Sequence, residues 1–328
     1  MKFGLFGGAR TKRSVGIEDS QGYQGFIDYV LEAERLGFHQ LFMVEHHFTG
    51  QGQVSASMTL LAYLAAKTSR IRLGTGVVVL PWHNPVLVAE QAATLDLLSG
   101  GRLDFGVGKG YRKMEFDGFC VPMEEANERF NEAIDIIRKA WTTEDRFSHH
   151  GPRWNYDNIV VEPAPIQQPH PPMWLAAGSY DSVRRAAREG FNLLLDQLAQ
   201  MDQIISRIDA FRDECEKIGR PYNSDMVAVA RALQMVHSEA ERQSAYDTRA
   251  RVVGVIGDLA RDKLAESVEQ DTAPLLGLPE EVIARLKQLE AGGATNILLV
   301  DPNASVGNLR AFASEVMPAF APVAAAAE

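Results

Sequence analysis

The sequence has no apolar run long enough to cross a membrane, and it has only two cysteines in 328 residues. A membrane-spanning helix needs about 20 consecutive apolar residues, so we expect no membrane partner. Two cysteines are too few for a disulfide framework, and we expect a reducing, cytoplasmic location. The amino-terminal residues 2–6 lack the architecture of a signal peptide and are expected to form a first strand.

An excess of positive charge is also missing. The chain has 33 Lys and Arg against 43 Asp and Glu, a net charge of -10. A nucleic-acid-binding surface needs grouped Lys and Arg, so we predict no nucleic-acid partner. A content of 46% apolar and 23% charged residues is typical of a soluble globular protein. The length of the chain is one that a single α/β barrel often has.

Short apolar segments alternate with helical patterns along the chain. Connections between them are short, and this alternation predicts parallel pairing of the strands. We therefore predict an α/β fold, a (β/α)8 TIM barrel, as a single domain over residues 1–328. Eight segments have the character of strands: residues 2–6, 41–44, 71–80, 102–107, 173–176, 191–195, 226–236 and 295–300.

Two segments interrupt the alternation. Residues 142–172 contain short aromatic stretches around a Gly-Pro pair and then a cluster of prolines, which predicts a hairpin or loop excursion. Residues 249–278 follow no clear period. For this second segment a mobile lid and an ordinary pair of surface helices both stay open.

Glu45, His46 and His47 follow directly after the apolar segment 41–44. Ligands bind at the carboxyl ends of parallel strands, and imidazoles there can act as acids, bases or anion-binding donors. Adjacent strand residues point to opposite faces, and no HExxH spacing supports zinc. We therefore predict that these three residues are catalytic and that no metal is bound. The alternative is a pair of hydrogen-bonded core histidines.

Glycine-containing loops follow two other predicted strands. Gly106–Tyr111 offers close backbone approach and the positive charge of Lys109, although the third glycine of a dinucleotide fingerprint is missing. Ala177–Ser182 places two hydroxyls at a helix start, which suits a phosphate, and an ordinary N-cap is the alternative. Lys109 and this second loop are predicted to be two sides of one phosphate pocket. Gly76, inside a β-branched strand, indicates close approach of a ligand.

In this order, these segments resemble the luciferase-like branch of the bacterial luciferase family of flavin-dependent monooxygenases. The resemblance is strongest over residues 1–200. No single segment is specific, but the ordered set is. It consists of Glu45–Thr49, Leu73–Pro81, Ala89–Gln91 with Ser99–Arg102, Phe105–Tyr111 and Ala177–Ser179.

The resemblance implies a barrel that uses reduced FMN and O2. In the family, a C4a-hydroperoxyflavin oxygenates a small organic substrate such as an aldehyde. His46 matches the family's catalytic histidine, and Lys109 stands where luciferases have an arginine on the flavin phosphate. The peptide bond between Gly76 and Val77 falls where the family has a non-proline cis bond, and we predict one here. The cofactor-binding residues so implied are Thr75, Gly76, Val77, Gly108, Lys109, Tyr111, Ala177, Gly178, Ser179 and Ser182.

The resemblance also implies two protein partners. A separate flavin reductase is expected, because the sequence has no convincing NAD(P)H fingerprint. A homodimer is expected through helices 54–67 and 85–98. Six alanines of these helices would permit close helix approach: Ala62, Ala65, Ala66, Ala89, Ala92 and Ala93. Two alternatives stay open: an oxidoreductase that transfers hydride with coenzyme F420 on the same barrel, and a non-catalytic flavin-binding subunit.

Overall fold

The computed structural model describes residues 1–11, 19–256, 271–301 and 303–321. The chain divides into two compact units. The N-terminal unit consists of Phe6–Glu34 and His39–Ala176, and the C-terminal unit consists of Met1–Leu5, Arg35–Phe38 and the chain from Ala177 onward. Among the described residues, no helix is long and apolar enough to cross a membrane.

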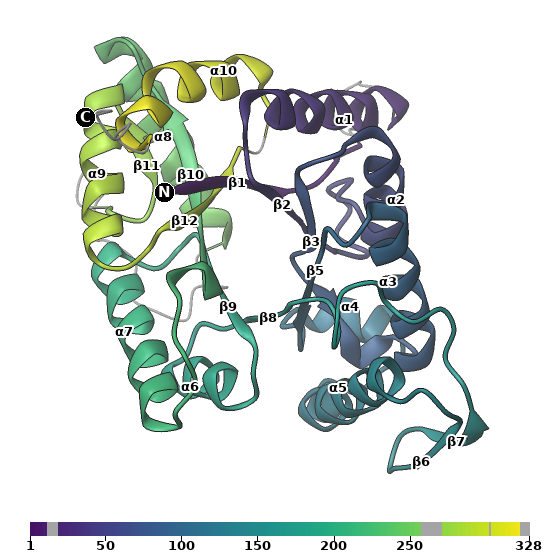
Figure 1. Ribbon diagram of the computed structural model, residues 1–328. Helices are drawn as coiled ribbons and strands as arrows, with labels where there is room; N and C mark the ends of the chain where they lie inside the picture. The colour runs from purple at the N-terminus through teal and green to yellow at the C-terminus, as the bar shows by residue number, and fades with distance from the viewer. Residues whose placement is uncertain (12–18, 257–270, 302, 322–328) are drawn as a thin grey trace, which may run out of the picture. The chain divides into compact units, whose positions relative to one another are not determined.

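The N-terminal unit alternates strands with helices, as the purple to teal part of Figure 1 shows. Helix α1 (Asp19–Leu36) comes first. The strands are β2 (Gln40–Met43), β3 (Arg72–Thr75), β4 (Val78–Val79), β5 (Leu103–Gly108), β6 (Phe147–His150), β7 (Asn155–Ile159) and β8 (Met173–Ala176). The helices are α2 (Ser57–Lys67), η1 (Leu80–Trp82), α3 (Pro85–Ser99), α4 (Lys113–Gly118), η2 (Met123–Glu125) and α5 (Ala126–Thr142).

The parallel strands of this unit lie in the order β2, β3, β5 and β8. All residues of β2 and β5 are buried, as expected for parallel strands covered on both faces. Register is set by pairs such as Met43 with Thr75 and Phe105 with Met173. The carboxyl ends of β2, β3 and β5 therefore meet at one edge of the sheet.

Helix α3 shows how local sequence sets the boundaries of a helix in this unit. Its first residue is Pro85, and the side chain of Asn84 accepts hydrogen bonds from the first free N–H groups. It ends where Gly100 takes φ 67°, a left-handed conformation that favours glycine. The guanidinium of Arg102 then donates to the carbonyl oxygens of Ala65 and Ile71, which joins the end of α2 to the start of β3.

The C-terminal unit contains a second set of parallel strands. Their order is β9, β10, β12 and the first residues of β1, and β11 pairs with β10. The strands are β1 (Lys2–Gly7), β9 (Asn192–Leu195), β10 (Val227–Met235), β11 (Leu275–Gly277) and β12 (Asn296–Val300). The helices are α6 (Tyr180–Arg188), α7 (Met201–Lys217), η3 (Ser224–Met226), α8 (Glu239–Ile256), α9 (Pro279–Ala291), α10 (Val306–Glu315) and η5 (Met317–Phe320). In Figure 1, α6 and α7 run side by side.

Each unit contributes four main parallel strands among its described residues, and all eight correspond to predicted segments. The segment 71–80 is not one strand, because it divides into β3, β4 and the 3-10 turn η1. The peptide bond between Gly76 and Val77 is cis, as predicted.

The two interruptions have different outcomes. Residues 142–172 include the antiparallel pair β6 and β7, whose strands pair Phe147 with Ile159. Nearly half of the segment for which a lid was one interpretation, residues 257–270 within 249–278, lies outside the described residues. The described ends of that segment belong to α8 and β11.

Candidate active site

Three segments bring polar side chains to the edge where β2, β3 and β5 end. Residues 45–48 follow β2, residues 82–83 lie at the end of η1 after β4, and helix α4 follows β5. The backbone amide of His46 donates to the carbonyl oxygen of Val54, which fixes the first of these segments. All of these residues belong to the N-terminal unit.

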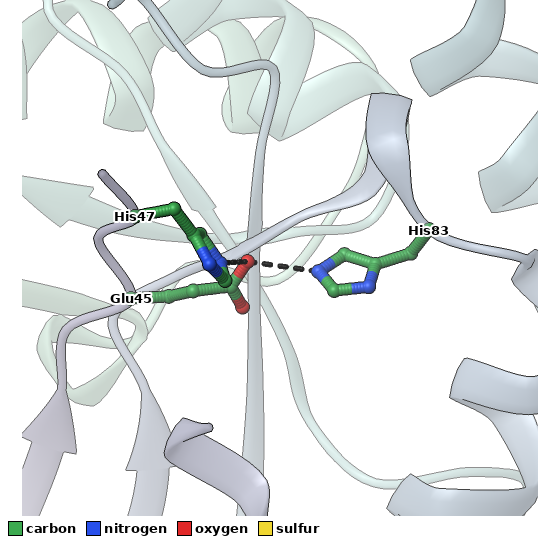
Figure 2. A group of neighbouring side chains, drawn as sticks. All are labelled: Glu45, His47 and His83. Atoms are coloured by element: carbon green, nitrogen blue, oxygen red, sulfur yellow. Dashed lines mark hydrogen bonds and ion pairs between the residues drawn. The ribbon is translucent and has the colours of Figure 1, made fainter. Parts of the chain in front are cut away.

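Glu45 is the acceptor for three of these side chains. Its Oε1 lies 3.1 Å from Nε2 of His47, 2.8 Å from Nε2 of His83 and 3.2 Å from the indole Nε1 of Trp82. Figure 2 shows both imidazole rings directed at this carboxylate. The Glu45 side chain is 3% exposed. Burial raises the pKa of its carboxyl, but the hydrogen bonds from His47 and His83 outweigh burial and lower that pKa to about 2.

His46 engages a different carboxylate, one that sequence reasoning missed. Its Nδ1 lies 3.1 Å from Oε1 of Glu115 in α4. The same oxygen accepts the backbone N–H of His47 at 2.9 Å. Burial raises the pKa of Glu115, yet the bonds from His46 and from the His47 amide lower it overall. Glu115 is therefore an anion that holds both histidines from one side.

Glu115 could be found only by predicting α4, and that short helix depends on a glycine. Gly110 has φ 75°, and a Cβ there would lie 2.8 Å from a Val79 methyl carbon and 3.0 Å from the ring of Phe116. The chain can therefore turn sharply from β5 into α4, which aims Glu115 back at residues 46 and 47. The available signal was a carboxylate in the sequence soon after the end of β5, whose carboxyl end lies at the same edge of the sheet as that of β2.

Aromatic rings enclose His47. The ring of Phe119 lies 4.7 Å from that of His47 in an edge contact and stacks on Trp82 at 5.3 Å with an interplanar angle of 20°. Phe48, which is 55% exposed, packs against Phe119 on the outer side. Such a cluster keeps water from one side of the histidine pair and leaves a partly exposed apolar surface.

Glu45, His47 and His83 also have the composition of a metal site. One potential ligand atom from each lies within 4.8 Å of the other two. The indole N–H of Trp82 cannot bind a metal, and it donates to the same Glu45 oxygen. The hydrogen-bonding needs of a buried carboxylate thus explain the cluster without an ion. The absence of a metal stays a prediction.

The predicted cofactor residues lie in both units. The hydroxyl of Thr75 donates to the carbonyl oxygen of Gly106 and accepts from its N–H, at 2.7 and 2.8 Å, so it is fully used within the sheet. Gly76, Val77 and Gly108 are half-buried or buried beside it, and the side chain of Tyr111 is exposed. Lys109 donates from Nζ to Oδ1 of Asn127 at 2.6 Å.

The second predicted loop starts α6 in the C-terminal unit. Ser179 is the N-cap of α6 and forms a capping box with Ser182. The two hydroxyl oxygens lie 3.0 Å apart. Ala177 is buried and Gly178 precedes the cap. This is the geometry of the structural alternative, an ordinary N-cap, and the pocket predicted from Lys109 and this loop together stays a prediction.

The burial of the alanines in α2 and α3 changes the argument for dimerisation that was based on them. Ala65, Ala89, Ala92 and Ala93 are buried within the N-terminal unit and therefore cannot line an interface. Of the other two predicted alanines, Ala62 is half-buried and Ala66 is exposed. The large apolar residues that α2 and α3 expose are Tyr63, Leu87, Leu97 and Leu98.

Residues 1–296 match the model of the family described as luciferase-like monooxygenase. The chain belongs to this family. The predicted enzyme class, a flavin-dependent monooxygenase, is confirmed at this level by the family and by the names of its relatives. One relative is the oxygenase component of the flavin-dependent trigonelline monooxygenase from Acinetobacter baylyi. It is 29% identical over 98% of this chain and 96% of its own length.

Solved structures confirm the fold. The monooxygenase RslO1 from Streptomyces bottropensis matches 98% of this luciferase-like chain and 100% of its own, with 26% identity and a TM-score of 0.84. The predicted (β/α)8 TIM barrel is therefore correct. The oxygenating constituent of 3,6-diketocamphane monooxygenase from Pseudomonas putida, solved with FMN, covers 97% of this chain and 98% of its own at TM-score 0.79 and 19% identity. The coenzyme F420-dependent tetrahydromethanopterin reductase from Methanopyrus kandleri covers 97% of this chain and 99% of its own, with a TM-score of 0.74 and 18% identity. At such identities these last two show the fold alone.

Proposed function

We propose that this luciferase-like monooxygenase uses reduced FMN and O2 to oxygenate a small organic substrate, and that a separate flavin reductase supplies the reduced FMN. The observation that carries the proposal is the adjacent pair His46 and His47 after β2, in which each imidazole contacts its own buried carboxylate. The naming of one relative as an oxygenase component supports a reductase partner. Reduced flavin, when bound, supplies the electrons that activate O2.

The polar and aromatic side chains beside His46 and His47 in the N-terminal unit suit the ring system of a flavin. Nε2 of His46 makes no hydrogen bond to any described residue, and the side chain is 16% exposed, so it can meet a ligand. Trp82 and Phe119 limit access of water to the other side of His47. In this proposal His46 holds or moves a proton at the reacting end of the bound molecules, and Glu45 and His47 keep that end ordered.

The phosphate end is proposed to depend on charge. Lys109 offers an ammonium group, and the N-terminus of α6 behind Gly178 and Ser179 offers free N–H groups and the positive end of a helix dipole. Either feature suits a phosphate. We expect Lys109 to exchange its bond with Asn127 for one with the cofactor.

The test supplies purified enzyme with FMN, a flavin reductase and NADH under isotopically labelled O2. The substrate panel contains alkanals, cyclic ketones, a terpene and an N-methylpyridinium carboxylate. We expect the label in the product of at least one substrate. The alternative, hydride transfer with coenzyme F420, predicts the opposite: turnover with reduced F420 in the absence of O2 and no label in any product.

Lys109→Ala should weaken FMN binding about tenfold to a hundredfold, because a hydrogen bond to a charged group contributes about 1.5–3 kcal/mol. Flavin titration followed by fluorescence quenching measures the affinity. Lys113→Ala is the matched control, since Lys113 forms an exposed pair with Asp117. Equal affinity in the Lys109 variant and the wild type would exclude the phosphate role.

A homodimer through α2 and α3 is part of the proposal. The exposed residues Leu87, Leu97 and Leu98 provide an apolar surface on α3 that a second copy could cover. Leu98→Glu should then shift the protein to a monomer in light-scattering measurements. A wild-type protein that is monomeric at micromolar concentration would contradict this part alone.

A further inference from the structure

The adjacent imidazoles of His46 and His47 use different ring nitrogens. His46 contacts Glu115 through Nδ1, and His47 contacts Glu45 through Nε2, both at 3.1 Å. The two carboxylates come from different elements, since Glu115 lies in α4 and Glu45 precedes the pair in the chain. The proton positions of the two rings can therefore be set independently.

Glu115 can only accept hydrogen bonds. Its side chain is 2% exposed, and its interactions with His46 and the His47 amide keep the pKa of its carboxyl below the ordinary value. An ionised carboxylate has no proton to give, so the hydrogen between it and His46 sits on Nδ1 of the ring. In the neutral imidazole, Nε2 is then the unprotonated nitrogen.

His47 has the opposite arrangement. Glu45 is ionised as well, so Nε2 of His47 carries the hydrogen in their contact. That ring also makes edge contacts with the stacked rings of Phe119 and Trp82, at 4.7 and 6.0 Å. Only His46 therefore presents an unprotonated Nε2, and no described residue forms a hydrogen bond with it.

We propose that Glu115 is a positioning residue that holds His46 in the Nδ1–H tautomer and thereby makes its Nε2 the proton acceptor of the site. The part His46 plays in turnover rests on the proposed function. The tautomer itself is a property of the protein alone. Glu115 acts through His46 and does not itself touch the reacting molecules in this proposal.

A purely structural role for Glu115 makes different predictions. Its second bond, to the His47 amide, joins the segment after β2 to α4. If that bond were its whole contribution, loss of Glu115 would lower stability and leave the tautomer of His46 unchanged. The two roles are separable, because one concerns a backbone N–H and the other a ring nitrogen.

Several charged groups surround the pair and bear on its pH dependence. Arg112, at the start of α4, favours the anion of Glu115. From the segment after β2 the neighbours are Glu45 and His47, and from the segment after η1 the neighbour is His83. Glu45 neutralises part of any positive charge on His47 and His83. Removal of the charge at Glu115 would therefore act mainly on His46.

The test reads the tautomer directly by long-range proton–nitrogen NMR on protein labelled with nitrogen-15 in histidine. His46→Gln removes one set of signals and so assigns His46. We expect the wild type to show a protonated Nδ1 and an unprotonated Nε2. Glu115→Ala should shift His46 toward the Nε2–H form. Glu115→Gln keeps an acceptor oxygen, so it should keep the tautomer and move the acid limb of the pH–rate profile to lower pH.

Glu132→Gln is the matched control. Glu132 is also a buried carboxylate in contact with a histidine, at 3.0 Å from Nε2 of His149. This variant should alter the signals of His149 and leave those of His46 and kcat unchanged. For Glu115→Ala we expect kcat to fall about tenfold to a hundredfold with little change in KM, as for impaired acid–base catalysis. If that variant does not fold, the wild-type tautomer and the pH–rate profile of Glu115→Gln decide the matter, since an unmoved acid limb would overturn the inference.

The outcomes separate this inference from the proposed function. A wild-type His46 with its proton on Nε2, or a tautomer that Glu115→Ala leaves unchanged, overturns the inference even if the enzyme oxygenates its substrate. The expected tautomer in a protein that shows no oxygenation would support the inference and reject the proposed function.

Discussion

The chain contains two adjacent histidine pairs, and they differ in what surrounds them. His46 and His47 follow a parallel strand, and each is held by a buried carboxylate. His149 and His150 end strand β6 of the hairpin. There His149 contacts the buried Glu132. His150 contacts Asp157 on the surface, where the side chain of His150 is 64% exposed and that of Asp157 is 84% exposed.

The difference follows from what the chain does at each place. In a strand, neighbours point to opposite faces, so His149 points inward and His150 outward. After β2 the chain leaves the strand, and Phe48 takes φ 57°, a left-handed conformation. Both imidazoles can then be partly buried side by side. Glu132 also accepts backbone N–H groups of Arg153 and Trp154, so its contacts hold a turn together. Within the described part of the chain, Glu45 accepts only from side chains.

The largest expected effect on stability concerns Glu45. Its pKa is about 2, against 4.5 for an ordinary glutamate, so its charged contacts stabilise the fold fully above pH 4.5 and lose that effect as pH falls toward 2. A shift of this size corresponds to about 3 kcal/mol. Glu45→Gln should lower the free energy of unfolding by about this amount at pH 7, measured by denaturant titration. The two proteins should converge in acid. Parallel curves throughout that pH range would contradict the assignment.

His46→Ala should reduce product formation on the order of 10²-fold, because it removes the proposed acid–base group. FMN affinity should be retained. The paired variant His149→Ala should leave turnover per folded enzyme unchanged, since His149 lies in the hairpin. An equal loss of activity in both variants would erase the distinction between the two histidine pairs.

Glu132→Gln should destabilise the protein by about 2 kcal/mol, because buried N–H groups lose a charged acceptor. The hairpin of β6 and β7 should then open to hydrogen exchange first, since Glu132 joins it to α5. Mass spectrometry of exchanged peptides tests this. Faster exchange in residues 45–48 instead would mean that the two sites are coupled.

His150→Ala should have the smallest effect, within about 0.5 kcal/mol of the wild type in thermal unfolding. An ion pair between exposed groups contributes little. A larger loss would show that the outer histidine of the hairpin has a partner of its own.

The fold, and the part of the site that follows β2, could be predicted because both depend on local sequence patterns. Apolar strands with turn residues at their ends located the segment after β2, and strand ends in a parallel sheet share an edge. The segment 71–80 was predicted as one continuous strand because it is mostly apolar and rich in β-branched residues, and such a pattern cannot show where the backbone turns into η1.

Contacts that depend on how a turn redirects the chain in the folded protein could not be predicted from the sequence. Glu115 reaches His46 only because Gly110 allows the turn into α4, and no periodicity encodes that turn. His83 reaches Glu45 only after η1 has redirected the chain. Six alanines of α2 and α3 were interpreted as a surface for helix approach, but four of them lie on the inward faces of these helices and pack within the unit.

The hydroxyl of Thr75 takes the place of main-chain pairing at the point where β3 gives way to β4. It satisfies both the amide and the carbonyl of Gly106. A slip of one residue between these strands would direct that hydroxyl to the opposite face of the sheet and leave two buried peptide groups without partners. One small polar side chain thus selects the register of two apolar strands. That register also sets how far the residues after each strand extend along the edge of the sheet.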